Sequence, residues 1–206
     1  MKLYYAPGAC SLAPHIALRE AGLPFTLTRL DMKTGLLEGG APIASVNPKG
    51  YVPVLDLDSG ERLTEVTAIL QYVADQKPET GLAPRYGTLE RYRLQEWLSY
   101  LSTEIHKAYW PLFHEDSLPE RPFAIARLEK RFDWIHAQVG DRPFLLGSQF
   151  TIADAYLVTV VNWMKPAGLD VTRWPGLKAY RARITERPAV QGALEAEGLR
   201  RPAPKI

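Results

Sequence analysis

The sequence has only one cysteine, Cys10, so no disulfide can form within the chain. It has no apolar run near the ~20 residues that cross a bilayer. The longest run, at residues 155–161, has the length of a buried helix segment. Pro7, Gly8 and Pro14 interrupt the apolar start before the hydrophobic part of a signal peptide is complete. These absences predict a cytoplasmic protein that has no membrane partner.

An excess of one charge sign is also missing. Lys and Arg number 25 and Asp and Glu number 23, which gives a formal net charge of +2 over 206 residues. The two signs are interspersed, so no basic patch is available for nucleic acid or an anionic membrane. Apolar residues make up 46% of the chain. We therefore expect a soluble protein, of one large or two small domains, whose partners are small molecules.

The stretch around Cys10 has the pattern of a strand, a turn and a helix. Leu3 and Tyr5 predict a short strand, Pro7 and Gly8 a turn, and Ser11 is placed to cap a following helix. Cys10 then lies at a helix N-terminus, where amide donors can lower a cysteine pKa from ~8.5 to between ~3.5 and ~7.5. The alternative is a buried, inert thiol, which is common for a lone cysteine. The strand–turn–helix pattern favours a reactive Cys10.

The first 80 residues predict an α/β domain. Its expected elements are, in order, a strand at 3–5, a helix ending at Gly22, a strand at 25–30 parallel to the first, a hairpin of strands at 54–57 and 62–64, and a helix from Glu65 to Pro78. Residues 31–46 are rich in glycine, and there we expect an irregular loop with at most a short helix. The breaker-rich residues 78–87 predict a linker between a domain at 1–80 and another at 87–206.

The second domain is predicted to be all helical. Apolar stripes at helical spacing indicate one helix that stops near Pro111 and another that ends at Gly140. Thr151 and Asp154 form a pattern like a capping box, and Pro175 opens a further helix. A short last helix ends near Gly198, and we expect the tail at 200–206 to be loose.

Five motifs occur in order along the chain: Tyr5-x-Pro7-Gly8-Ala9-Cys10-Ser11, Asn47-Pro48-x-Gly50-x-Val52-Pro53, Leu63-Thr64-Glu65, Glu104-x-His106-Lys107 and Phe150-Thr151-Ile152-Ala153-Asp154-Ala155-Tyr156. In this order they resemble the cytosolic glutathione S-transferases, and together the bacterial beta class. The resemblance implies a thioredoxin-like β-α-β-β-β-α domain followed by a helical bundle that contributes the electrophile site. It also implies a homodimer, glutathione as co-substrate, no prosthetic group and no metal site.

The resemblance assigns roles to individual residues. It implies that Cys10 and His106 are catalytic. The implied glutathione-binding set is Tyr5, Cys10, Tyr51, Val52, Pro53, Glu65, Val66, Glu104, His106 and Lys107. A cis bond before Pro53 is implied, which exposes the backbone of Val52 to the cysteinyl part of glutathione.

Several of these residues also have ordinary structural explanations. Amides at the start of the helix at Glu65 can bind the γ-glutamyl carboxylate, but Glu65 can also simply complement the helix dipole. Val66 departs from the family, where a small residue, often serine, follows the acid. From composition alone, we would expect His106 and Lys107 to be solvated.

Other side chains have two possible uses. Glu104 is implied to reach a ligand across a dimer interface, and Tyr5 to be either packing or a wall of the site. Tyr109, Trp110 and Phe113 are either core or the apolar pocket for an electrophile.

The function implied is glutathione transfer to small hydrophobic electrophiles. One alternative is glutathione-dependent thiol–disulfide exchange through Cys10, for which a single cysteine suffices. The other is a glutathione-binding scaffold without catalysis, because a fold does not dictate an activity.

Overall fold

The computed structural model describes residues 1–200. The tail predicted to be loose, at 200–206, therefore lies outside the described residues except for Arg200. The chain forms two compact units. The first contains Met1–Leu82 and the segment that begins at Glu186, and the second contains Ala83–Thr185. The sequence analysis placed this last segment in the second domain. The structure packs its helix against the first unit, a long-range contact that a search for linkers cannot detect.

A mixed sheet of five strands forms the centre of the first unit. The strands are β1 (Lys2–Tyr5), β2 (Thr26–Asp31), β3 (Leu36–Leu37), β4 (Val54–Asp56) and β5 (Arg62–Thr64), in the spatial order β3-β2-β1-β4-β5. The pairing of β1 with β2 is parallel, as predicted, and the other pairs are antiparallel. The sequence analysis missed β3, because two residues are too few to show an alternating pattern.

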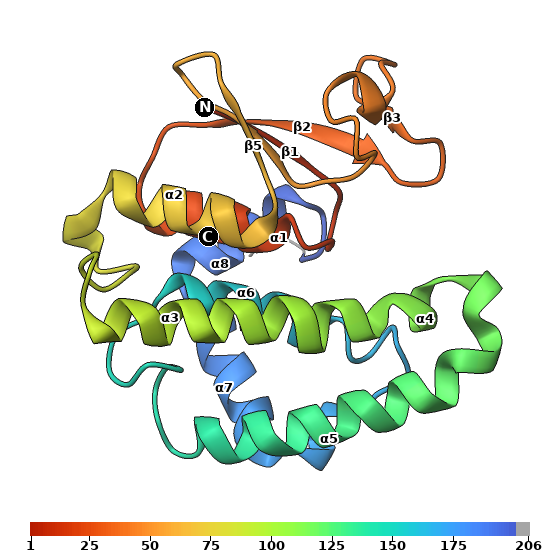
Figure 1. The fold of residues 1–206 in the computed structure, drawn as a ribbon, viewed down its shortest axis with the longest axis vertical. Helices are drawn as coiled ribbons and strands as arrows, with labels where there is room; N and C mark the ends of the chain where they lie inside the picture. The colour runs from red at the N-terminus through yellow and green to blue at the C-terminus, as the bar shows by residue number, and fades with distance from the viewer. Residues whose placement is uncertain (201–206) are drawn as a thin grey trace, which may run out of the picture. The chain divides into compact units, whose positions relative to one another are not determined.

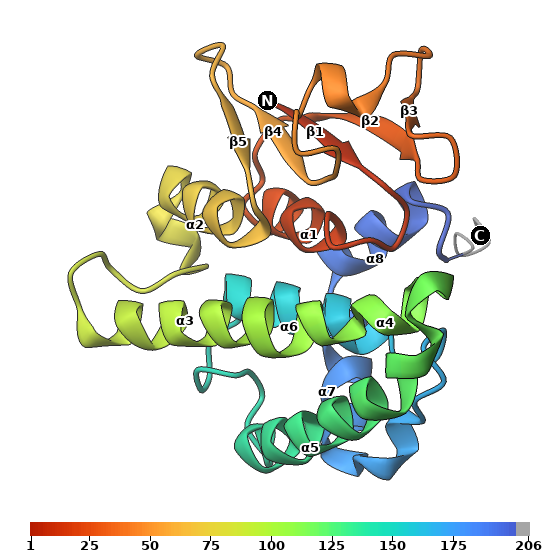
Figure 2. The ribbon, with the colours of Figure 1, turned by 45° about the vertical axis from the view of Figure 1, so that its right-hand side comes forward.

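Helices α1 (Leu12–Glu20) and α2 (Val66–Gln76) lie side by side beneath the sheet, and α8 (Pro188–Ala196) packs against α1 (Figures 1 and 2). The predicted apolar stripe of α2 is confirmed as buried: Val66, Ile69, Leu70, Val73 and Ala74. A cluster of buried apolar residues includes Tyr4, Leu37, Val54 and Ile43, the last in a short 3-10 turn, η1 (Ile43–Ser45). Because Leu3, Tyr4 and Tyr5 are all buried, both faces of β1 are covered.

The second unit is helical, as predicted. Its α-helices are α3 (Leu89–Tyr100), α4 (Trp110–Phe113), α5 (Arg121–Val139), α6 (Ile152–Asn162) and α7 (Pro175–Thr185). A π-helical segment, η3 (Leu101–His106), and a 3-10 segment, η4 (Lys107–Tyr109), join α3 to α4. The other 3-10 turns of this unit are η5 (Glu115–Glu120) and η6 (Val171–Arg173), whereas η2 (Pro78–Thr80) follows α2 in the first unit.

The helical path does not stop near Pro111, in contrast to the prediction. It continues to Phe113, because Pro111 falls in the first turn of α4, where a missing N–H costs little. Apart from Trp97, which is half-buried, the predicted stripes are buried: Leu94, Leu98, Leu101, Ile105, Ala108, Leu128, Phe132, Ile135 and Val139. No helix of residues 1–200 combines the length and the apolar character needed to cross a membrane.

The capping box at α6 is present, as predicted. The buried Asp154 carboxylate accepts hydrogen bonds from the Thr151 amide at 2.8 Å, the Leu145 amide at 2.8 Å and the Tyr180 hydroxyl at 2.6 Å. Burial raises the pKa of Asp154, and these donors act against that rise. Asp154 therefore joins the start of α6 to α7 and to the preceding loop.

Candidate active site

The loop between β1 and α1 places Cys10 immediately before the first turn of α1. Ser11 does not cap the helix through its side chain, in contrast to the prediction. Its hydroxyl instead accepts a hydrogen bond from the Ala6 amide at 3.1 Å and donates one to the Ala6 carbonyl at 3.2 Å. Gly8 has a φ of +72°, a conformation that glycine adopts without a steric penalty. The two ends of the loop are thus held together around Cys10.

The Cys10 thiol donates a hydrogen bond to the carbonyl oxygen of Val52, at an Sγ–O distance of 3.4 Å. The residue is partly accessible, but burial around Sγ raises the pKa of Cys10 to about 12. The amides of Cys10 and Ser11 act in the opposite direction, and the Glu65 carboxylate raises the pKa further. The expected thiolate is therefore wrong for the unliganded chain, because desolvation outweighs the helix N-terminus.

The Val52–Pro53 peptide bond is cis, as the family resemblance implied. Val52 is buried, and its position is set by the residues before it. The side-chain amide of the buried Asn47 donates to the carbonyl of Tyr51 at 2.7 Å. Asn47 is therefore a supporting residue of the site, a role that the sequence analysis did not assign to it.

Glu65 precedes α2 in an unusual backbone conformation. Its φ is +70°, and no other non-glycine residue in the described range has a positive φ. Such a conformation costs on the order of 1–3 kcal/mol and is frequent at functional sites. The carboxylate accepts hydrogen bonds from Lys49 at 2.6 Å and from the Tyr51 hydroxyl at 3.0 Å. The sequence analysis missed Lys49, because its partner lies on a different element.

Val66 follows Glu65 as the first residue of α2, and its side chain is buried among the apolar residues of the helix. Its side chain has no hydroxyl, so Val66 can bind a ligand only through its backbone amide at the start of α2. The predicted anion site at α2 therefore depends on backbone amides and not on side chains.

Tyr5 is buried at the end of β1, with its ring 6.2 Å from that of His15. Burial raises the pKa of its phenol, with a further contribution from the Glu197 carboxylate. A phenol with a raised pKa is a poor source of a phenolate near neutral pH. Of the two uses considered for Tyr5, its burial favours packing.

The predicted site residues of the second unit lie in the π-helical and 3-10 segments between α3 and α4. Nδ1 of His106 lies 2.7 Å from the hydroxyl of Tyr156, and its ring centroid lies 4.9 Å from that of Trp163. π-Helical turns are frequent at functional sites. The sequence analysis did not pair His106 with Tyr156, which is 50 positions away.

Glu104 and Lys107 also have partners within this unit. Hydrogen bonds from Arg131 and Arg127 hold the pKa of Glu104 below its ordinary value. The Glu104 carboxylate lies 2.8 Å from Nε of Arg131 and 3.1 Å from Arg127. Nζ of Lys107 lies 5.9 Å from the ring centroid of Trp110. Glu104 is thus a charged group whose orientation is determined by α5.

The three aromatic residues predicted to be either core or the electrophile pocket differ in their exposure to solvent. Tyr109 is 1% exposed and stacks on Phe113 at a centroid distance of 5.8 Å, so it belongs to the core. Trp110 and Phe113 are 56% and 46% exposed. Of these three aromatic residues, Trp110 and Phe113 therefore present apolar surface to solvent.

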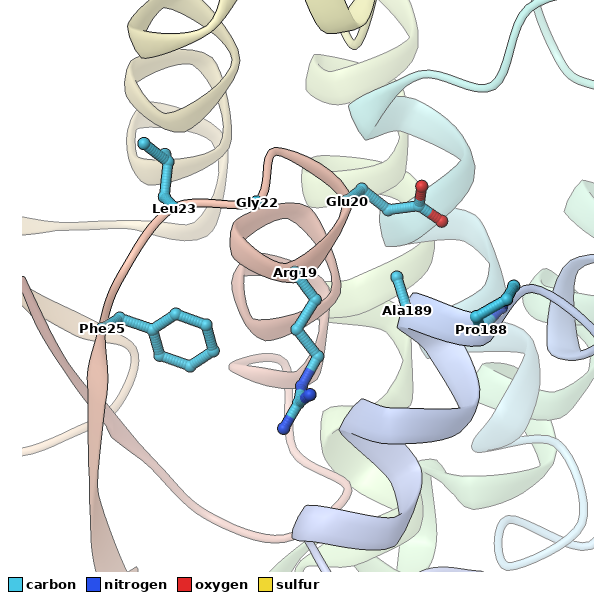
Figure 3. Close-up of a pocket in the computed structure, with 7 residues that line it drawn as sticks. All are labelled: Arg19, Glu20, Gly22, Leu23, Phe25, Pro188 and Ala189. Atoms are coloured by element: carbon cyan, nitrogen blue, oxygen red, sulfur yellow. The ribbon is translucent and has the colours of Figure 1, made fainter.

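A separate shallow pocket lies at the C-terminal end of α1 (Figure 3). It is lined by Arg19, Glu20, Gly22, Leu23, Phe25, Pro188 and Ala189. None of the predicted glutathione residues lines it. The pocket is therefore distinct from the region around Cys10 and Val52.

Comparisons with known proteins agree with the geometry of both units. The family described as glutathione S-transferase, N-terminal domain, matches residues 8–76, and the family described as glutathione S-transferase, C-terminal domain, matches residues 115–183. The glutathione S-transferase GstA of Escherichia coli O157:H7 is 46% identical over 97% of this chain and 100% of its own length. The chain belongs to the glutathione S-transferase family.

Solved structures of glutathione S-transferases indicate which class of the family this chain resembles. The bacterial beta class enzyme of Sphingomonas chungbukensis is 47% identical, with a TM-score of 0.91 over 97% of this chain and 100% of the other. A sphingomonad glutathione S-transferase complexed with glutathione is 45% identical, with a TM-score of 0.90 and the same coverage. The thioredoxin-like domain, the helical domain and the beta class resemblance are thereby confirmed. Glutathione is the co-substrate of this transferase.

Proposed function

We propose that this transferase joins the glutathione sulfur to small hydrophobic electrophiles at a site that includes Cys10, Val52 and Glu65. The observation that carries the proposal is the contact between Cys10 and Val52, which brings the helix N-terminus of α1 to the backbone before Pro53. The sulfur of glutathione would lie beside Cys10 when its cysteinyl backbone pairs with Val52. Its γ-glutamyl carboxylate would then bind the first amides of α2, beside Glu65.

In this proposal the Cys10 thiol donates its hydrogen bond to the Val52 carbonyl in the unliganded chain, and to the glutathione sulfur once glutathione is bound. A thiol whose pKa is raised to about 12 stays protonated at neutral pH. A protonated thiol can donate to a neighbouring thiolate, and donation to the charged form lowers the pKa of the group that receives it. The thiolate of glutathione is then the nucleophile, and its new bond to carbon forms as the electrophile releases its leaving group or accepts the electron pair.

Glu104, His106 and Lys107 are proposed as the contribution of the second unit to glutathione binding, on the basis of the family resemblance. His106 has a defined ring position because it contacts Tyr156, and Glu104 is oriented by two arginines. Trp110 and Phe113 are the apolar residues proposed to contact the electrophile. A homodimer is proposed on the same basis, and light scattering at micromolar concentration tests it: a monomeric mass would contradict it.

Thiol–disulfide exchange through Cys10 is the second candidate. It requires the Cys10 thiolate to attack oxidised glutathione, which forms a Cys10–glutathione disulfide and releases a glutathione thiolate. The raised pKa disfavours this step, because the thiolate and not the thiol is the nucleophile. Conjugation is therefore the better supported reaction.

Two assays on the same protein distinguish the functions. We expect the chain to bind immobilised glutathione, elute with free glutathione, and conjugate glutathione to an aryl halide. We expect Cys10→Ala to keep part of the conjugation activity. Loss of conjugation in this variant, together with rapid formation of a mixed disulfide by the wild type, would favour exchange. Absence of both reactions would leave the scaffold.

A further inference from the structure

Glu197 is a buried acid that ends α8, directly behind the loop that contains Cys10. It is the C-cap residue of α8 and is 5% exposed. A carboxylate at a helix C-terminus lies at the negative end of the helix dipole, and burial adds a desolvation cost. Both local preferences therefore oppose an acid at this position. Its presence is explained by what its two oxygens bind.

One oxygen binds the loop, and the other binds α1. Oε2 of Glu197 accepts a hydrogen bond from the amide of Gly8 at 2.8 Å. Oε1 lies 2.8 Å from Nδ1 of His15, a fully buried residue of α1. A single carboxylate thus joins α8, α1 and the loop between β1 and α1.

Arg19 determines where the proton of His15 lies. Nε of Arg19 donates to Nε2 of His15 at 3.0 Å, so Nε2 is the acceptor. The proton of the neutral imidazole is then on Nδ1, which donates to Glu197. Figure 3 shows Arg19 extending from α1 alongside α8. These two contacts link the positively charged Arg19 to the negatively charged Glu197 through the imidazole of His15.

Through Glu197, these contacts hold the middle of the loop between β1 and α1, which contains Cys10. Ser11 and Ala6 hold the two ends of the loop together, whereas Glu197 binds its central residue, Gly8. The Leu199 side chain also packs here, 3.6 Å from the position that a Cβ on Gly8 would take. Cys10 follows Gly8 by two positions, so a shift at Gly8 moves its thiol relative to Val52.

We propose that Glu197 is a positioning residue that holds the Cys10 thiol against the Val52 carbonyl through its bond to Gly8. The proposal rests on the proposed function in one respect, that the glutathione sulfur binds beside Cys10. Glu197 itself does not touch the reacting atoms. Its effect reaches them through the loop, with His15 fixing the orientation of its carboxylate.

The test compares two variants of the same helix pair. Glu197→Gln keeps the shape of the side chain but loses the charge and one acceptor. Arg187→Gln is the matched control, because Arg187 joins the other end of α8 to α1 through its hydrogen bonds to Glu20. Since Cys10 is the only cysteine, iodoacetamide reports its accessibility directly in each folded variant.

We expect Glu197→Gln to react with iodoacetamide about tenfold faster than the wild type near neutral pH, because a thiol released from Val52 is more exposed and less desolvated. We expect its KM for glutathione to rise about threefold, with a smaller change in kcat. Arg187→Gln should stay within about twofold of the wild type in both measurements. Equal alkylation rates in the two variants would overturn the proposal.

If Glu197→Gln does not fold, Glu197→Asp takes its place, because it keeps the charge but withdraws it from Gly8. If neither Glu197 variant folds while Arg187→Gln does, Glu197 serves the fold as a whole and the positioning role is rejected. If the wild type fails to conjugate glutathione, the proposed function fails, and the alkylation comparison still decides the role of Glu197.

Discussion

Cys10 and Val52 are 42 positions apart in the sequence, yet the thiol of one donates to the carbonyl oxygen of the other at 3.4 Å. The contact gives Cys10 a neutral thiol with a defined direction, at the start of α1. It also reverses the expectation for a cysteine at a helix N-terminus. The helix amides are present, but burial has the larger effect on the pKa of Cys10.

Alkylation of Cys10 should therefore be slow at neutral pH and accelerate only in alkaline solution. We expect the rate with iodoacetamide to keep rising above about pH 9, beyond the range of an ordinary thiol. Glu65→Gln should shift the profile to lower pH, because the Glu65 carboxylate raises the pKa of Cys10. A profile with an apparent pKa at or below that of a free cysteine would contradict the burial argument.

Stability should fall in alkaline solution. The pKa values of Cys10 and Tyr180 are both raised in the folded chain, mainly by burial. Above about pH 8.5 the unfolded chain loses protons that the folded chain keeps, so the free energy of unfolding decreases as the pH rises. Urea unfolding near pH 8 and pH 10 measures the change. Cys10→Ala should reduce the slope between these values, and an unchanged slope would remove Cys10 as its source.

Two substitutions distinguish the effect of the positive φ at Glu65 from the effect of its carboxylate. Glu65→Ala and Glu65→Gly both remove the carboxylate, but only glycine adopts this conformation without strain. We expect Glu65→Gly to be more stable than Glu65→Ala by about 1 kcal/mol, as measured by urea unfolding. Glutathione affinity should fall in both, by about tenfold, because an interaction with a charged group is lost. An affinity retained in both variants would show that the carboxylate is not part of the site.

His106 and Tyr156 should act as one unit in catalysis. We expect His106→Ala to lower kcat by about tenfold or more, and Tyr156→Phe by about threefold, because the phenylalanine keeps the packing but loses the hydroxyl that contacts Nδ1. The double variant should resemble His106→Ala, since the hydroxyl acts through the imidazole. Steady-state kinetics with saturating glutathione provides the comparison. Additive losses would show that Tyr156 acts independently of His106.

Much of the fold could be predicted from local sequence patterns. The stripe of α2 from Val66 to Ala74 and the capping box of Thr151 and Asp154 are each contained within a few turns of one helix. Their spacing alone indicates which side is buried and where the helix begins. The motifs with Cys10, Val52 and Glu65 likewise identified the family, because each is a short contiguous pattern.

Tertiary structure decided how those residues behave. The hydroxyl of Ser11 was expected to cap α1 but bonds to Ala6, because the loop folds back on the end of β1. The protonation of Cys10 depends on desolvation by surrounding atoms, which no helix pattern contains. Glu197 and His15 are 182 positions apart and meet only because α8 packs on α1. The sequence by itself determined most of the helices, the capping box of α6 and the family, since these follow from neighbours along the chain. Burial and long-range contacts determined the chemistry at Cys10, since desolvation and hydrogen-bond partners depend on which distant segments surround a group.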